Sequence, residues 1–144
     1  MTKSFSQTSP DSARRLVVDL PCSKKSLARA RHKIVMFASE HGFGAEAQDI
    51  ALAAQEALKN IIQYAHPADN NMHFECTVAG ENFTIDVIDQ GSGFDVTILE
   101  KDHATPMSLH GRGIKLIRGL MDSVRITSDS EGTVVHMQKK RSLP

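Results

Sequence analysis

Residues 72–89, MHFECTVAGENFTIDVID, alternate apolar and polar side chains on both sides of a central glycine. Alternation over this length is typical of half-buried β-strands, and Gly80-Glu81-Asn82 supplies turn-forming residues between the two runs. The stretch therefore predicts two antiparallel strands, Met72–Ala79 and Phe83–Asp89. It ends on an acidic residue that is followed at once by glycines, in Asp89-Gln90-Gly91-Ser92-Gly93.

The chain before this hairpin has the pattern of one strand and two helices. Arg14–Leu20 reads as a strand that Pro21 stops, and its apolar content and place after a polar start predict a sheet edge. The alternative is that both faces of this strand are buried in the monomer. Apolar positions at helical spacing predict helices over Lys24–Glu40 and Glu46 to about Ala65.

After the hairpin, residues Phe94–His110 show no clear period, and connections of this length are usually functional or mobile. Gly111-Arg112-Gly113 is expected to begin a helix over Ile114–Met121, followed by strands Val124–Ser128 and Thr133–Lys139. The order β-α-α-β-β-loop-α-β-β groups the strands in hairpins. It predicts an α+β fold, a mostly antiparallel sheet with helices on one face.

Length and composition indicate one domain and exclude several classes of function. We expect a flexible N-terminus (1–12), a single domain (13–141) and a short tail (142–144). Seventeen basic and seventeen acidic residues cancel, which argues against general binding of nucleic acid or anionic membrane. No signal peptide or transmembrane stretch is evident, so we expect a cytoplasmic protein in which Cys22 and Cys76 are free thiols.

A first candidate site lies on the second predicted helix. Glu56 and Asn60 are four residues apart and share one helix face, where a carboxylate and an amide oxygen can position water and Mg²⁺. Taken alone, the pair is also compatible with two solvated polar residues on an amphipathic helix.

Two further candidates are glycine motifs. Asp89 ends a strand ahead of Gly91 and Gly93, and its carboxylate could accept a hydrogen bond from an exocyclic amine such as that of adenine. The alternative is an ordinary turn. Gly111-Arg112-Gly113, at the expected start of a helix, suits phosphate, with His110 or Arg112 adding positive charge. The chain has no Walker P-loop or Rossmann fingerprint.

The order of these three motifs resembles the N, G1 and G2 boxes of the GHKL ATPase superfamily, which includes the ATP-binding domains of gyrase, histidine kinases and MutL. Glu131-Gly132-Thr133 resembles that superfamily's last Gly-Thr element, beside the adenine site. The finer resemblance is to RsbW-like anti-sigma factor serine/threonine kinases, through residues 53–66 (AAQEALKNIIQYAH) and 113–124 (GIKLIRGLMDSV). The resemblance implies the two-layer α/β sandwich of the Bergerat type.

The resemblance also implies roles for the candidate residues. Glu56 would be the general base for a substrate hydroxyl, and Asn60 would be the Mg²⁺ ligand. Asp89 would bind the adenine of ATP, with Thr133 beside it. The remaining positions would shape the pocket or contact phosphates, with Phe94–His110 as the ATP lid: Gly91, Gly93, His110, Gly111, Arg112 and Gly113.

The partners implied are a small antagonist protein, as the phosphorylated substrate, and a sigma factor or similar effector that the kinase sequesters. Such kinases form homodimers, and the strand Arg14–Leu20 is a candidate interface. Two alternatives remain. One is a non-catalytic module whose binding of partners depends on nucleotide. The other is the ATP-binding part of a histidine kinase, against which stands the lack of a helix with a phospho-acceptor histidine before Arg14.

Overall fold

A five-stranded antiparallel sheet forms one layer of the computed structural model, which describes residues 14–65, 70–89, 108–129 and 132–142. The strand order is β1-β2-β3-β5-β4, and every neighbouring pair is antiparallel. The strand β5 lies between β3 and β4, so β4 is not the neighbour of β3 although it follows β3 in the sequence. The strands are β1 (Arg14–Pro21), β2 (Asn71–Ala79), β3 (Asn82–Asp89), β4 (Ser123–Asp129) and β5 (Gly132–Lys140).

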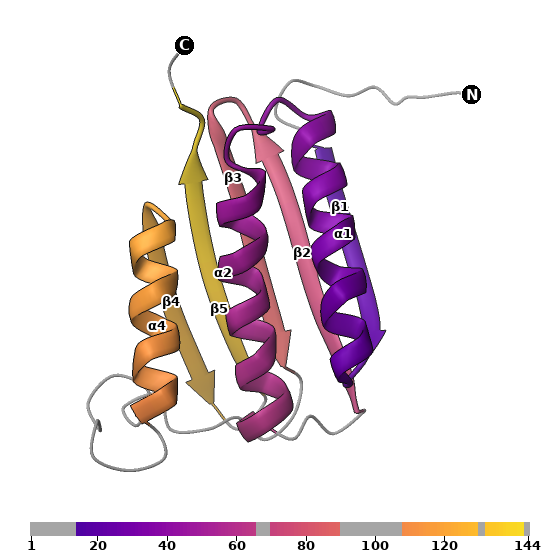
Figure 1. Ribbon diagram of the computed structural model, residues 1–144, viewed down its shortest axis with the longest axis vertical. Coiled ribbons are helices and arrows are strands. Elements are labelled where there is room, and N and C mark those ends of the chain that lie inside the picture. The colour runs from indigo at the N-terminus through magenta and orange to yellow at the C-terminus, as the bar shows by residue number, and fades with distance from the viewer. Residues whose placement is uncertain (1–13, 66–69, 90–107, 130–131, 143–144) are drawn as a thin grey trace.

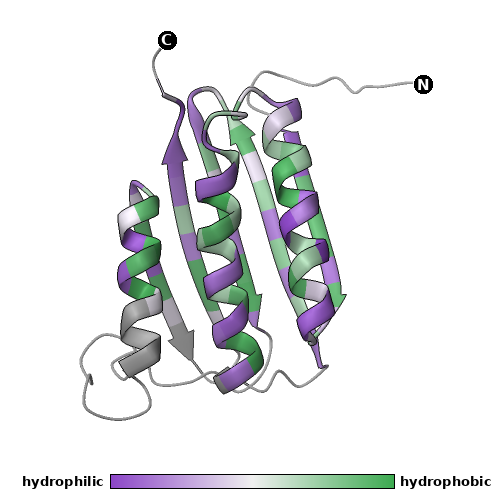
Figure 2. Cartoon of the chain, in the orientation of Figure 1, coloured by the Kyte–Doolittle hydropathy of each residue, from purple (hydrophilic) through white to green (hydrophobic). Residues whose placement is uncertain are grey.

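The second layer consists of helices that cover one face of this sheet (Figure 1). They are α1 (Lys24–Glu40), α2 (Ala47–Asn60), which continues into the short π-helix η1 (Ile61–Ala65), and α4 (Ser108–Leu120). Each long helix is amphipathic (Figure 2), so that apolar side chains meet the sheet and polar ones face outward. The predicted α+β class, with an antiparallel sheet and helices on one face, is confirmed. In the part of the chain that the structure describes, no helix is long and apolar enough to cross a membrane.

The β2–β3 hairpin forms as predicted. Side chains of β3 alternate strictly between buried and half-buried, because one face packs on the helices. Ala79 pairs with Asn82, which leaves a two-residue loop. Its first residue, Gly80, has a φ of 59°, the left-handed value that a type II′ turn requires at that position.

β1 lies at an edge of the sheet, as predicted. Val18 and Leu20 are buried under the helices, but Val17 points to the other side and is 67% exposed. The alternative that both faces of this strand are buried in the monomer is therefore wrong. Farther in, Cys76 on β2 is buried, and both it and Cys22 are free thiols, as predicted.

Alanine packing sets the position of α2 between its neighbours. Five alanines of this helix are buried, which lets its backbone approach α1 and the sheet closely. Large side chains fill the remaining space: Ile34, Ile50, Leu58, Phe74 and Phe83 are all fully buried. The carboxyl half of α2 is thereby held rigidly over the sheet, and this half carries the first candidate motif.

A buried carboxylate fixes the other end of α2. Glu46 precedes the helix, is 3% exposed, and accepts a hydrogen bond from the backbone N–H of Ser142 at 2.9 Å. Burial acts to raise the pKa of Glu46, but the hydrogen bonds from Ser142 and the nearby charge of Lys139 outweigh it, so the pKa lies below its ordinary value. The ionised carboxylate therefore ties the end of the chain to the start of α2.

The start of α4 differs from the prediction. The helix begins at Ser108, so Gly111-Arg112-Gly113 lies inside it and does not precede it. Glycine costs a helix about 1 kcal/mol relative to alanine. Burial of Ile114 and Ile117 in the core offsets that cost. Reading the glycines as a helix boundary was therefore wrong.

Candidate active site

The candidate motifs converge at one end of the molecule. Figure 1 shows the carboxyl ends of α2 and β3 at the same end as the amino ends of α4 and β5. Glu56 and Asn60 come from α2, Asp89 ends β3, Thr133 opens β5, and Gly113 lies in α4. Four elements that are distant in sequence therefore meet around one region.

Glu56 and Asn60 face α4 at the position of Gly113. A Cβ added at Gly113 would lie 3.5 Å from Glu56 Oε1 and 3.9 Å from Asn60 Oδ1. Both side chains are sheltered, since the Glu56 side chain is 19% exposed and Asn60 is 8% exposed. This geometry disfavours the alternative of two solvated polar residues. Because residue 113 has no side chain, the backbone of α4 approaches the two oxygens closely.

Lys59 orients the carboxylate of Glu56. Its Nζ donates a hydrogen bond to Glu56 Oε2 at 3.3 Å. One carboxylate oxygen is thus paired with the ammonium while the other, Oε1, is turned toward Gly113. Sequence analysis missed this residue, although a Glu and a Lys three residues apart on a helix are spaced to pair.

Asp89 and Thr133 form a second, buried part of the site. They are directly opposite each other in the β3–β5 register, and each is 1% exposed. Burying a carboxylate this deeply is costly unless hydrogen-bonded or charged groups compensate it. Buried ionisable side chains are therefore found mainly where function retains them. The β3–β5 register thus brings together two residues that the resemblance assigned to the adenine site, and their role there stays a prediction.

The π-helix η1 follows Asn60 directly. The backbone N–H of Ile61 is shared between the carbonyls of Ala57 and Leu58, where the α-helical ladder changes. Ile61 is buried at this point, and η1 leads the chain toward the site end. π-Helical turns are rare and are found frequently at functional sites. The sequence offered no signal for it, since helical periodicity alone predicted an unbroken helix to about Ala65.

Several predicted site residues cannot be placed. Gly91 and Gly93 lie outside the described residues, as does most of the predicted lid. His110, Gly111 and Arg112 belong to the first half of α4, but their side-chain positions lie outside the description. Their assignments therefore stay predictions.

The oxygens gathered around Gly113 are of the kind that Mg²⁺ prefers. Within residues 14–65, 70–89, 108–129 and 132–142, no three His, Cys, Asp or Glu side chains form a group that could hold a metal ion. Mg²⁺ in nucleotide sites usually keeps several waters and takes few protein ligands, with substrate phosphates supplying others. The residues present therefore fit a magnesium ion that arrives with a nucleotide.

Comparisons with known proteins identify the family of the chain. The family model of the histidine kinase-like ATPase domain matches residues 20–139. The serine-protein kinase RsbW of Listeria monocytogenes is 28% identical over 136 residues, which cover 87% of this chain and 86% of that protein. The serine-protein kinase RsbW of Bacillus licheniformis is 34% identical over 103 residues, which cover 64% of this chain and 63% of that protein.

Solved structures show the same fold. The structure of the RsbU and RsbW domains of a Mycobacterium tuberculosis protein superposes with a TM-score of 0.69 at 19% identity, covering 91% of this chain and 33% of that chain. The histidine kinase domain of a blue-light activated kinase from Erythrobacter litoralis gives a TM-score of 0.52 at 18% identity, covering 83% of this chain and 61% of that chain. The chain belongs to the histidine kinase-like ATPase domain family, and within it resembles the serine-protein kinases named RsbW.

Proposed function

We propose that this protein is an ATP-dependent serine/threonine-protein kinase of a partner-switching module. The observation that carries the proposal is the placement of Glu56 Oε1 and Asn60 Oδ1 around the position of Gly113. In this proposal the base for the hydroxyl and the oxygen ligand for magnesium both face α4 at position 113. The absence of a side chain at that position leaves room beside them for the ligand. Phosphoryl transfer needs mainly such positioning and charge neutralisation.

Each residue has a distinct role in this proposal. Asp89 and Thr133 hold the adenine end of ATP, because they are buried together at the sheet end. Asn60 donates an oxygen to Mg²⁺, which neutralises phosphate charge when bound. Glu56 Oε1 accepts the proton of the substrate hydroxyl, while Lys59 holds the carboxylate in place.

The substrate would be a serine or threonine of a small antagonist protein, and the unphosphorylated antagonist would release a sequestered sigma factor or similar effector. The names of the RsbW relatives support a kinase of this kind. The β1 edge is the candidate interface of a homodimer, because Val17 is an exposed apolar residue on that strand. Such a homodimer would provide a two-fold surface for one effector.

The test is transfer of labelled phosphate from Mg-ATP to candidate antagonist proteins of the same genome. Glu56→Gln should bind ATP nearly as well as the wild type but phosphorylate the antagonist about 10²–10⁴-fold more slowly. Glu75→Gln is the matched control, since Glu75 pairs with Arg15 on β1 and lies away from the site. Wild-type binding of nucleotide with no transfer to any candidate would favour the alternative, a non-catalytic module that uses nucleotide to set its affinity for a partner.

A further inference from the structure

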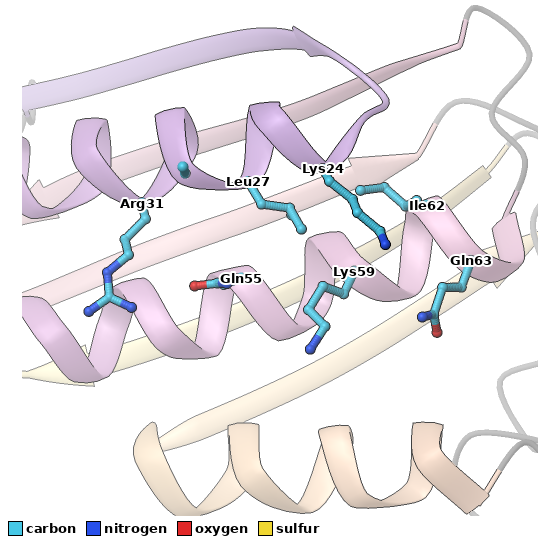
Figure 3. A pocket seen from close by; sticks show the side chains of 8 residues that line it. Lys24, Leu27, Arg31, Gln55, Lys59, Ile62 and Gln63 are labelled. Atoms are coloured by element: carbon cyan, nitrogen blue, oxygen red, sulfur yellow. The ribbon is translucent and has the colours of Figure 1, made fainter.

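A groove between α1 and α2 lies on the outer side of the helical layer and shares Lys59 with the candidate active site. Its volume is about 420 Å³, within the usual size range of ligand sites. Lys24 and Arg31 of α1 and Lys59 of α2 line it, together with Leu27 and Ile62, and none of the described residues that line it is acidic. Figure 3 shows Arg31 reaching from α1 toward α2 and Gln55 lying between the two helices.

The basic charge on α1 is not explained by helix stability. The helix carries five Lys or Arg residues and one Glu, whereas the whole chain has seventeen of each sign. Lys24 and Lys25 occupy the first turn, where the helix dipole disfavours cations, and that turn holds no acidic residue. Of the five basic residues, Lys24 and Arg31 are the two that line the groove. Residues that weaken their own helix are expected where function retains them.

The lining of the groove points to the chemical class of its occupant. Leu27 and Ile62 form an apolar floor on which aliphatic side chains of a polypeptide can pack. Among the described lining residues none is aromatic, so the groove offers no ring on which a nucleic-acid base could stack. Three cations above such a floor therefore favour an acidic polypeptide segment over a nucleic acid.

Lys59 links this groove to Glu56. It lines the groove, yet its ammonium is turned to Glu56 Oε2 at 3.3 Å, and its side chain is 45% exposed. A carboxylate bound in the groove would compete with Glu56 for the same ammonium. Because coupling between two sites is reciprocal, removing the negative charge of Glu56 while Lys59 is kept should strengthen binding of a carboxylate in the groove.

We propose that the α1–α2 groove binds an acidic segment of a protein partner, and that Lys59 couples its occupancy to the orientation of Glu56. Occupancy draws the ammonium away and frees Glu56 Oε2, so that a partner bound in the groove changes the state of the candidate base. The consequence for catalysis rests on the proposed function of Glu56, whereas binding in the groove does not.

The first experiment measures the affinity of a fluorescent poly-glutamate peptide by anisotropy at low salt, without nucleotide. The Lys24→Gln/Arg31→Gln variant should bind it about three- to tenfold more weakly than the wild type, from the usual strength of exposed ion pairs. Lys25→Gln/Lys33→Gln is the matched control, because it removes the same charge from the same helix at residues that do not line the groove. Equal losses in the two variants would overturn the proposal, as would binding of an oligonucleotide of equal charge at least as tightly.

The second experiment tests the coupling in the same assay. Glu56→Gln should bind the peptide about two- to fivefold more tightly than the wild type, because it no longer competes for Lys59. In a Lys59→Gln background the same substitution should change nothing. An unchanged affinity of Glu56→Gln in the wild-type background would overturn the coupling. Since no ATP is present, inactivity of the protein as a kinase cannot produce either result.

Discussion

Gly113→Ala should stabilise the protein while impairing it. The added Cβ would lie 3.5 Å from Glu56 Oε1 and 3.9 Å from Asn60 Oδ1, which are ordinary van der Waals contacts and require no shift of the fold. Alanine in place of glycine inside a helix contributes about 0.5–1 kcal/mol, so the Tm should rise by about 2–4 °C. The same methyl group occupies the space beside the two oxygens, and a displacement of about 1 Å of reacting groups can cost roughly 10²-fold in rate.

Gly119→Ala is the control, because Gly119 is in the same helix and a Cβ there would meet nothing within 4 Å. Both variants are compared by thermal melting and by phosphate transfer, or by magnesium-dependent ATP binding where no antagonist is known. We expect both to melt higher than the wild type, and Gly113→Ala alone to lose activity or affinity. Full activity in Gly113→Ala would refute the assignment of this space to the ligand. A lower Tm for that variant would show that the site is packed more tightly than the distances indicate.

Two other predictions concern stability and assembly. The pKa of Glu46 is lowered in the folded protein, so its contribution to stability is present above the unfolded pKa and is lost as the pH falls through the folded pKa. Denaturant unfolding of the wild type should therefore lose more stability between neutral and acidic pH than unfolding of Glu46→Gln does, and parallel pH profiles would contradict this. In sedimentation at micromolar concentration the wild type should be a dimer through the β1 edge, and Val17→Lys should shift it toward monomer, because Val17 is 67% exposed there. A wild-type monomer that ATP does not change would rule out that interface.

Local patterns predicted most of the fold. Alternation in residues 72–89 identified the β2–β3 hairpin, and helical spacing identified α1 and α2, because each pattern records which side chains one face must bury. The place of β5 between β3 and β4 depends on contacts distant in sequence, so the order of strands in the hairpins could not reveal it. The start of α4 was missed because burial of Ile114 and Ile117 outweighs the propensity of two glycines.

The arrangement of the candidate residues could be predicted in part. Glu56 and Asn60 could be paired from their spacing, but their direction toward Gly113 follows from the packing of α2 on α4. Asp89 lies opposite Thr133 because of the register between β3 and β5. Hydrophobic alternation and a glycine turn constrain such a register but do not determine it alone. The pairing of Lys59 with Glu56 is local, and its spacing on the helix could have been recognised.

Calorimetric titration with Mg-ATP and Mg-GTP tests the central claim most directly, because it requires no knowledge of the protein partner. Asp89 lies buried beside Thr133, where its carboxylate can accept a hydrogen bond from the amine of adenine, a group that guanine replaces with a carbonyl oxygen. We expect magnesium-dependent binding of ATP and ADP, weaker binding of GTP, and loss of that preference in Asp89→Asn. No binding of ATP in the presence of magnesium would contradict the nucleotide site itself, and equal affinity for ATP and GTP would contradict the role of Asp89.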